Sequence, residues 1–578
     1  MKALKILAFS VASIAVLSGC GGDSGSDRLE VDTLGFIDEQ VITSGENVEG
    51  LVTATYAWLG NDHYTAPNLL WPSGNLRAGD ALKGGNGPAD IFGYEAMSLY
   101  APITADMASI NSPDFVDFQN KKWSRNYTGI SRANLALKNL GNANEFDLRT
   151  TRIAETRFLR AFWYFDLKIH HKRVPWIDES MTDEDILAAS NVDLTDQELW
   201  QKIVDDLRFS AENLPATQPQ VGRVNKYAAK AFLAKVLLYK AYEQNDMHEV
   251  VAVNPLHLQE VVDLVDEIES SGVYDLSSDY GDNFLAAGDN SVESVFEIQR
   301  SRDDGSPDGK GSYPTALNGP QANLAGFYGC CGFHVPTDNF VNAFKTDADG
   351  LPLFDTYNNA LIQSADVVDP RLDHTVGMQG KPFKYSADIH GGNAWARNPA
   401  LYGNYTSMKE LEHPGSGSLM LNGPFTISSM NTKIIRYADV LLWKAEALIE
   451  LGTSQGLEEA RAIINRIRDR AAFSISKVAG TSIYNVGNYD DSFADQDEAR
   501  RALRWERRLE LGLEGWRFFD LVRWGVAKET IDAYLAVAKT RKTWLSDAEF
   551  IAGKHEYLPI PLTQLNLSGG LYVQNPGY

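Results

Sequence analysis

Two segments that lie far apart in the chain carry the same helical pattern, and this repetition limits the fold more than any other feature. Residues 227–242 (YAAKAFLAKVLLYKAY) and 437–451 (YADVLLWKAEALIEL) place apolar and alanine residues three and four positions apart, which is the spacing of one helix face. A second amphipathic segment follows each of them, at residues 256–268 and 457–471. Because small residues at facing positions let two helices approach closely, the sequence predicts two pairs of packed helices.

These predicted pairs resemble tetratricopeptide repeats whose spacing is imperfect. Further helices are predicted at residues 148–170, 196–213 and 495–514. A repeat helix needs neighbours to bury its apolar face, so we expect all of these helices to stack into one superhelical scaffold. The predicted fold class is therefore mainly α, a tetratricopeptide-like helical superhelix.

A large irregular lobe is predicted to interrupt this superhelix. Residues 275–430 are rich in Gly, Pro, Asn, Asp, Ser and aromatic residues with little periodicity, and residues 61–90 form a second irregular stretch. Long loops inside a compact protein are usually functional, and their aromatic content argues against disorder. We therefore predict a helical scaffold over residues 36–274 and 431–578, with a loop-rich lobe over residues 275–430.

The start of the chain has the pattern of a signal peptide. Lys2 and Lys5 precede an apolar run over residues 6–16, which is too short to cross a hydrocarbon core of ~30 Å. Leu17-Ser18-Gly19-Cys20 resembles the bacterial lipobox, which implies cleavage after Gly19 and lipidation of Cys20. The alternative is an ordinary secretory signal with a chance cysteine. We predict a signal peptide over residues 1–19 and a lipidated flexible tether over residues 20–35.

The charge balance excludes several classes of function. Lys and Arg number 53 and Asp and Glu number 77, which gives a net charge of −24. Nucleic-acid binding depends on cationic contacts, so we predict no nucleic-acid partner. The single short apolar run also excludes a polytopic membrane protein.

No motif for a cofactor or for catalysis is present. The sequence lacks HExxH, Walker A, GxSxG and dinucleotide-type glycine motifs, so we predict no cofactor, no metal and no catalytic residue. His170 and His171 point in different directions on a helix, and the aspartates at 303–308 and 347–349 are interpreted as solvated turns rather than calcium ligands. A glycosidase needs two carboxylates ~5–9.5 Å apart, which 77 acidic residues leave open.

Two adjacent cysteines offer one further constraint. If Cys20 carries lipid, Cys330 and Cys331 can pair only with each other or remain free. Oxidation is favoured outside the cytoplasm, and Gly329 and Gly332 supply the freedom that a tight turn needs. The sequence therefore allows a vicinal disulfide, with two buried free thiols as the alternative.

Several motifs in the C-terminal third resemble those of SusD/RagB-type lipoproteins. They are residues 435–442 (IRYADVLL), 445–448 (AEAL), 506–511 (ERRLEL), 514–525 (EGWRFFDLVRWG), 558–561 (LPIP) and 574–578 (QNPGY). Residues 335–337, 340–344 and 349–350 resemble the segment that follows the central loop of the family. Gln564 and Ser568-Gly569 depart from the usual pattern in the closing tail.

The resemblance implies a non-catalytic outer-membrane lipoprotein of a Bacteroidetes glycan-uptake system, with a SusD-like body over residues 36–578. Such proteins capture oligo- or polysaccharide at the cell surface and deliver it to a SusC-like TonB-dependent transporter. The alternatives are a tetratricopeptide-type scaffold that binds proteins and, third, a glycoside hydrolase. The charged residues of the motifs alternate at helical spacing and are predicted to form ion pairs that brace the last helices. These are Glu506, Arg507, Arg508, Glu510, Glu514, Arg517, Asp520 and Arg523.

Three groups of aromatic and polar residues are candidates for a sugar site, since sugars stack on aromatic rings and hydrogen-bond to planar polar groups. The groups are His63, Tyr64, Trp71, Asn75, Arg77, Asp80 and Lys83; Tyr313, Phe327, Tyr328 and the cysteine turn; and Tyr385, Trp395, Arg397, Tyr402 and Tyr405.

From these groups we predict a stacking surface and its polar partners. Trp71, Trp395 and Tyr328 are expected to stack on the sugar, with Tyr64 beside them. Asn75, Arg77 and Asp80 are expected to bind hydroxyl groups. For any single aromatic residue, core packing is the alternative. The acidic body favours a neutral glucan over an anionic polysaccharide.

Overall fold

The structure is a computed structural model that describes residues 45–578 except 62, 65–66, 102–117, 144–145, 303, 305–310, 321–327, 329, 393–394 and 423–424. The predicted signal peptide, Cys20 and the tether lie outside the described residues. Residues Thr43–Tyr578 form one compact unit. No helix in the described part of the chain is both long and apolar enough to cross a bilayer.

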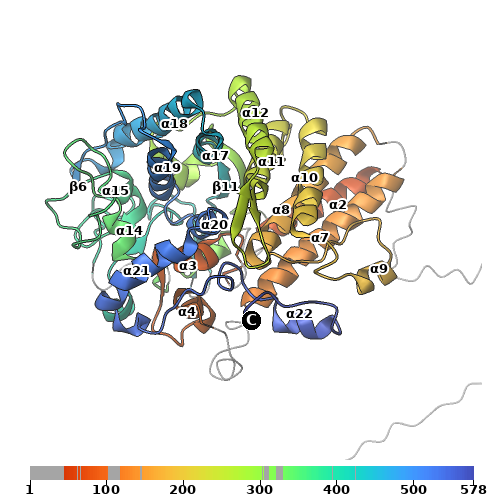
Figure 1. Cartoon of the computed structure of the whole chain (residues 1–578), viewed down its shortest axis with the longest axis horizontal. Helices are drawn as coiled ribbons and strands as arrows, with labels where there is room; N and C mark the ends of the chain where they lie inside the picture. Colours follow the sequence, from red (N-terminus) through yellow and green to blue (C-terminus); the bar gives the residue numbers. More distant parts are fainter. Residues whose placement is uncertain are drawn as a thin grey trace, which may run out of the picture. The chain divides into compact units, whose positions relative to one another are not determined.

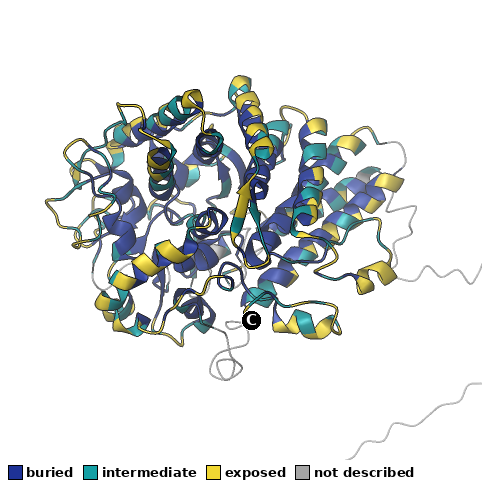
Figure 2. Cartoon of the chain, in the orientation of Figure 1, coloured by how far each residue is buried: buried dark blue, intermediate teal, exposed yellow. Residues whose placement is uncertain are grey.

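The first half of the chain forms a row of helices in which each helix packs against the next (Figure 1). The row consists of α2 (Gly45–Gly60), α7 (Phe118–Asn142), α8 (Arg149–His171), α10 (Asp196–Asn213), α11 (Lys226–Ala241) and α12 (Pro255–Ser271). This order confirms the predicted stacking, in which neighbours in sequence are neighbours in space. Helices α8 and α11 are buried over most of their length, whereas α2, α7, α10 and α12 each expose one side (Figure 2).

The second half of the scaffold continues this row after the lobe. Its helices are α17 (Tyr437–Leu451), α18 (Ser454–Phe473), α19 (Gln496–Glu510), α20 (Arg517–Arg523) and α21 (Ala527–Arg541). Helix α17 packs on α12 although the whole lobe separates them in sequence. Gly452 ends α17 in the left-handed conformation, with φ of 72°, a conformation that favours glycine.

Helix α19 is shorter than the sequence predicts. The expected helix runs to residue 514, but α19 ends at Glu510. Leu513 and Gly515 have φ values of 64° and 90°, which break the helix. The break lets Gly515 approach Gly74 so closely that a Cβ atom at Gly74 would overlap the carbonyl oxygen of Gly515. The C-terminal motif is therefore packed against the first irregular stretch.

Short two-stranded sheets tie the lobe together and to the scaffold. β4 (Ser294–Ile298) pairs antiparallel with β11 (Thr432–Arg436), which closes the lobe where it leaves and rejoins the scaffold. β1 (Ala81–Gly84) pairs antiparallel with β5 (Phe333–Pro336), which joins the first irregular stretch to the lobe. β9 (Leu419–Asn422) and β10 (Phe425–Ser428) form a hairpin in which Asn422 faces Phe425.

The remaining elements are short. The strands are β2 (Tyr242–Gln244), β3 (Val250–Val253), β6 (Val367–Val368), β7 (Val376–Gly377), β8 (Thr406–Ser407) and β12 (Ile483–Tyr484). The α-helices are α3 (Leu76–Ala78), α4 (Phe92–Leu99), α9 (Asp183–Ala188), α14 (Asp338–Asn342), α15 (Arg371–Thr375), α16 (Pro399–Tyr402) and α22 (Leu562–Leu567). One π-helical turn is η2 (Trp71–Asn75). The 3₁₀-helical turns are η3 (Tyr280–Phe284), η4 (Ala286–Gly288), η5 (Tyr313–Thr315), η8 (Ser476–Val478) and η9 (Thr543–Leu545).

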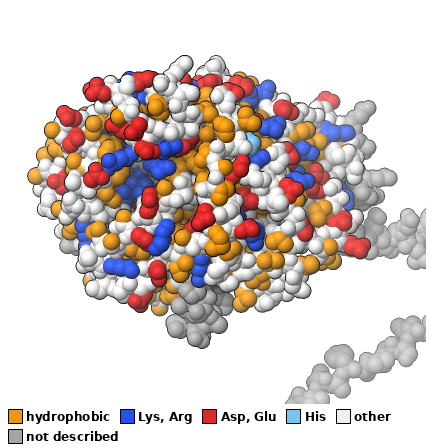
Figure 3. Space-filling view, viewed as in Figure 1, with side chains coloured by type: hydrophobic (Ala, Val, Ile, Leu, Met, Phe, Trp, Pro, Cys, Tyr) orange, Lys and Arg blue, Asp and Glu red, His pale blue; other side chains and the backbone are white. Residues whose placement is uncertain are grey.

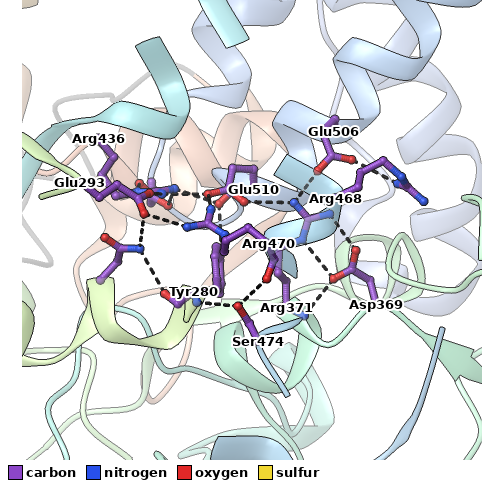
Figure 4. Close-up of polar contacts among 12 residues, drawn as sticks. Tyr280, Glu293, Asp369, Arg371, Arg436, Arg468, Arg470, Ser474, Glu506 and Glu510 are labelled. Carbon is purple, nitrogen blue, oxygen red and sulfur yellow. Dashed lines mark hydrogen bonds and ion pairs between the residues drawn. The ribbon is translucent and has the colours of Figure 1, made fainter. Parts of the chain in front are cut away.

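A buried network of arginines and carboxylates joins the scaffold to the lobe (Figure 4). Glu510 of α19 pairs with Arg436 at 2.8 Å, with Arg470 of α18, and with Arg371 of α15 at 3.1 Å. Arg371 also pairs with Glu506 at 2.6 Å and with Asp369 at 2.7 Å. The motif charges therefore form the predicted ion pairs.

The pairs reach further than the last helices, because Asp369 and Arg371 belong to the lobe. Other ion pairs join α20 to neighbouring helices of the scaffold. Arg523 of α20 pairs with Glu446 of α17, and Arg507 of α19 bridges Asp439 of α17 and Asp520 of α20 at 2.8 Å each.

Candidate functional site

Four aromatic rings form a continuous row at the surface, and we refer to Tyr313, His63, Tyr64 and Phe425 as the aromatic row. The ring of His63 stacks on Tyr313 with centroids 5.7 Å apart and lies 3.9 Å from that of Tyr64. The centroids of Tyr64 and Phe425 are 5.4 Å apart. His63 is exposed and the other three are partly exposed. The row therefore presents aromatic surface to solvent.

Three separate segments hold the aromatic row in place. The hydroxyl of Tyr94 in α4 donates a hydrogen bond to the carbonyl oxygen of Tyr64. Tyr313 opens η5, and the amide of the preceding Ser312 donates to the carbonyl oxygen of Ser428 at 2.8 Å. Ser428 and Phe425 belong to the same strand, β10. The row is thus built on the core and on one hairpin, which preorganises it for a ligand.

The polarity of the row suits a ligand with both apolar and hydroxyl faces. Aromatic rings offer flat apolar surface, while the edges of tyrosine and histidine carry polar groups. A pyranose has C–H groups on its ring faces and hydroxyls around its rim. The arrangement can therefore hold a sugar by stacking, without any reacting group.

Trp71 is buried, contrary to its predicted place on the stacking surface. Its side chain has 0% exposure, so neither ring face is available to a ligand in this conformation. The ring stacks on His334, with centroids 4.9 Å apart, and contacts Tyr94 edge-on at 5.1 Å. Because Tyr94 in turn holds Tyr64, Trp71 lies beneath the aromatic row as part of its support.

The predicted hydroxyl partners are also buried and engaged within the protein. Asn75 hydrogen-bonds to His334 at 2.9 Å and to the carbonyl oxygen of Leu513 at 2.8 Å. Arg77 packs over the ring of Phe518 at 3.8 Å, and burial lowers the pKa of its guanidinium to about 10. Asp80 pairs with Arg508 at 2.8 Å. These three residues join the first irregular stretch to the C-terminal motifs and are not open to a ligand here.

Tyr328 and Trp395 form a small core of the lobe. Both rings pack edge-on against Phe383, at 5.6 and 4.8 Å between centroids. The hydroxyl of Tyr328 donates to the carbonyl oxygen of Glu412 at 2.7 Å. Trp395 is only 6% exposed. Of the predicted binding residues, Tyr64 is therefore the one that the structure places at the surface.

The adjacent cysteines are joined by a disulfide. Cys331 is buried, whereas Cys330 is partly exposed. The amide of Cys331 donates to the carbonyl oxygen of Leu317 at 3.0 Å. The bridge is therefore hydrogen-bonded to the segment that carries Tyr313.

Phe425 is the member of the row that the sequence analysis missed. It directly follows Asn422-Gly423-Pro424, and Gly-Pro pairs are strong turn signals. An aromatic residue beside such a turn lies at the end of a hairpin, where burial is incomplete. That local signal could have identified Phe425.

No metal site is found among the described residues, since no group of three or more His, Cys, Asp or Glu side chains is arranged to hold an ion. His170 and His171 have ring centroids 6.3 Å apart and different partners, Ser73 and the carbonyl oxygen of Pro559. Asp347 accepts hydrogen bonds from the amides of Asp349 and Leu351, both at 2.9 Å. Asp303 and Asp308 lie outside the described residues.

Two family models match the chain. The model described as the SusD family matches residues 292–578. A second model, described as starch-binding associating with outer membrane, matches residues 94–238. The chain belongs to the SusD family.

Individual relatives agree with this assignment over most of the chain. SusD-like protein P2 of Formosa agariphila is 26% identical over 464 residues, which cover 79% of this chain and 80% of the relative. A SusD-like protein of Bacteroides ovatus is 25% identical over 540 residues, which cover 89% of this chain and 81% of the relative.

Solved structures share the fold. A SusD homolog from Bacteroides thetaiotaomicron superposes with a TM-score of 0.68 at 22% identity, covering 93% of this chain and 98% of the other. Surface glycan-binding protein A from the same species, solved in complex with laminarihexaose, superposes with a TM-score of 0.65 at 21% identity, covering 92% and 100%.

Proposed function

We propose that this protein is a non-catalytic, cell-surface glycan-binding lipoprotein that captures oligo- or polysaccharide on the aromatic row. The single observation that carries the proposal is the row itself, four adjacent rings held at the surface by three segments. Relatives in fold include a laminarin-binding SusD-like protein and a surface glycan-binding protein solved with laminarihexaose. Both ligands are neutral glucans, and the acidic composition of this chain favours the same class.

Delivery to a transporter and attachment to the membrane are the finer parts of the proposal. The family resemblance implies a SusC-like TonB-dependent transporter as the partner. The lipobox-like residues before Cys20 support an outer-membrane lipid anchor. Detergent-phase partition of the full chain tests the anchor: it should enter the detergent phase, and Cys20→Ala should stay in the aqueous phase. Equal partition of both chains would contradict the anchor.

Affinity gel electrophoresis tests the binding function. Residues 21–578 are run in gels that contain laminarin, soluble starch or pectin, and released reducing ends are assayed in parallel. The pectin gel tests for binding of an anionic polysaccharide. It is included because Lys and Arg side chains gather in a hollow at the left of one face (Figure 3). We expect retardation by a neutral glucan without new reducing ends.

Each other result has a defined meaning. New reducing ends would overturn the non-catalytic role and favour a glycoside hydrolase. No retardation in any of the three gels would overturn glycan binding for these classes and favour the protein-binding scaffold.

The vicinal disulfide is proposed to stiffen the segment that carries Tyr313. If so, reduction with dithiothreitol should weaken glycan retardation several-fold, because the ring of Tyr313 would lose its fixed position. The double variant Cys330→Ser/Cys331→Ser should behave like the reduced protein and should no longer respond to dithiothreitol. Unchanged retardation after reduction would remove the disulfide from the site.

A further inference from the structure

The lobe contains an open concavity apart from the aromatic row, which we call the polar cleft. It has a volume of about 470 Å³, which lies within the range of small-molecule sites. Residues from the lobe line it, together with Thr481, Ser482 and Lys542. None of the four residues of the aromatic row lines this cleft.

An aromatic ring forms part of the wall of the cleft. Tyr405 is partly exposed and packs against two hydrophobic clusters, each of which combines residues of the lobe with residues of the first irregular stretch. This packing fixes the ring, and the carboxylate of Asp338 interacts with its hydroxyl. Tyr402 also lines the cleft, but it is buried and donates to Glu95 at 3.0 Å. One supported tyrosine ring is therefore available for stacking.

The charged residues of the cleft are compensated within the protein. Lys381 pairs with Asp373 at 2.9 Å. Asp366 lies 3.8 Å from Lys345 and accepts the amide of Gln363 at 2.8 Å. Asp338 attracts Lys542, whose ammonium donates to the carbonyl oxygen of Leu401 at 3.2 Å. The cleft therefore offers no unbalanced charge for an ionic ligand.

Amide groups at the edge of the cleft remain for a ligand. Gln379 and Asn404 are exposed. Over the part of the chain that the structure describes, neither side chain has a hydrogen-bond partner in the protein. Amides both donate and accept, which suits hydroxyl groups.

We propose that the polar cleft is a second saccharide subsite, which binds a segment of the same neutral glucan that the aromatic row captures. The inference rests on the proposed function and adds a second contact to it. A tyrosine ring, two open amides and compensated charges suit an uncharged, hydroxyl-rich ligand. An anionic sugar would lack a free cation here, and an apolar ligand would leave the amides unsatisfied.

Hydrogen exchange of residues 21–578 with saturating laminarihexaose locates the contact. We expect slower exchange in peptides that cover residues 361–368 and 402–405, as well as in those that cover residues 63–64 and 425–428. Protection of the row alone would overturn the second subsite and leave the proposed function intact. Protection at neither place would overturn both for this glucan.

Variants of the exposed amides give an independent measure that does not depend on the core. Gln379→Ala/Asn404→Ala should weaken laminarin binding about tenfold, the result expected from losing two hydrogen bonds. Gln259→Ala, an exposed glutamine of α12 outside both sites, is the matched control and should bind as the wild type does. Equal affinity of the double variant and the control would contradict the subsite.

Discussion

Glu510 shows how one side chain can hold two parts of the molecule together. Its carboxylate meets three guanidiniums, from Arg371, Arg436 and Arg470, and all four groups are buried. These charges lower the pKa of Glu510 below its usual range despite burial. The residue therefore stays ionised wherever the protein is folded at moderate pH.

Removing this charge should be costly. Glu510→Gln keeps the size of the side chain but leaves the guanidiniums short of one negative charge. We expect the free energy of unfolding in urea to fall by about 3–5 kcal/mol. Asp497→Asn removes an exposed partner of Arg500 and should change the free energy of unfolding by less than about 1 kcal/mol. Equal effects of the two substitutions would refute a structural role for the network.

Individual binding residues were the hardest feature to predict. Trp71 lies among Pro72, Ser73 and Gly74, without an apolar stripe, which made it look exposed. It is buried because His334, distant in sequence, stacks on its ring. The composition of the residues around Trp71 carries no information on a contact with a residue so distant in sequence. Tyr64 lies on the same irregular stretch and has similar neighbours, yet it is partly exposed.

At the scale of elements, the helices were predictable and the lobe was not. The pattern at 437–451 predicted the exact bounds of α17, which Gly452 ends. Helical periodicity is local, so it survives in the sequence. The lobe instead depends on pairings such as β1 with β5, which connect segments far apart in the chain and leave only turn signals behind.

The close approach of Gly74 and Gly515 gives an element-scale prediction. A Cβ atom at Gly515 would lie 2.5 Å from the Cβ of Leu70, and φ there is 90°. Gly515→Ala should therefore lower the free energy of unfolding by about 2–4 kcal/mol, through steric overlap as well as backbone strain.

Gly272→Ala is the control for backbone strain alone. Gly272 also has a positive φ, 63°, but nothing lies within 4 Å of its Cβ position. We expect Gly272→Ala to lower the free energy of unfolding by about 1–2 kcal/mol. If Gly515→Ala cost no more than Gly272→Ala, the tight packing between the motif and the first irregular stretch would be disproved.

Across the whole molecule, buried neutral histidines should make stability depend on pH. Burial lowers the pKa of His170 and His248 to about 3 and of His171 and His555 to about 4. In the unfolded chain these pKa values return to about 6.5. Below that pH the unfolded chain binds more protons, so stability is lost as the pH falls from about 6.5 towards 4.

Urea unfolding at pH 7, 6 and 5 measures this effect. We expect the free energy of unfolding to drop by at least about 2 kcal/mol between pH 7 and pH 5. Asp289 acts in the opposite direction, because burial raises its pKa to about 6, and burial also raises the pKa of Glu95, Asp206 and Glu556. The buried histidines outweigh these groups, since burial lowers the pKa of His257 and His374 as well. An unchanged or higher stability at pH 5 would show that these histidines are not buried and neutral.

The central claim is that the aromatic row is the surface that holds the glycan. The most direct test is calorimetric titration of laminarihexaose into wild-type protein, Tyr64→Ala, Phe425→Ala and Phe473→Ala. Phe473 is 77% exposed at the end of α18 and serves as an exposed aromatic control outside the row. We predict that Tyr64→Ala and Phe425→Ala each weaken binding about tenfold or more, while Phe473→Ala binds as the wild type does. Wild-type affinity in both row variants would contradict the account.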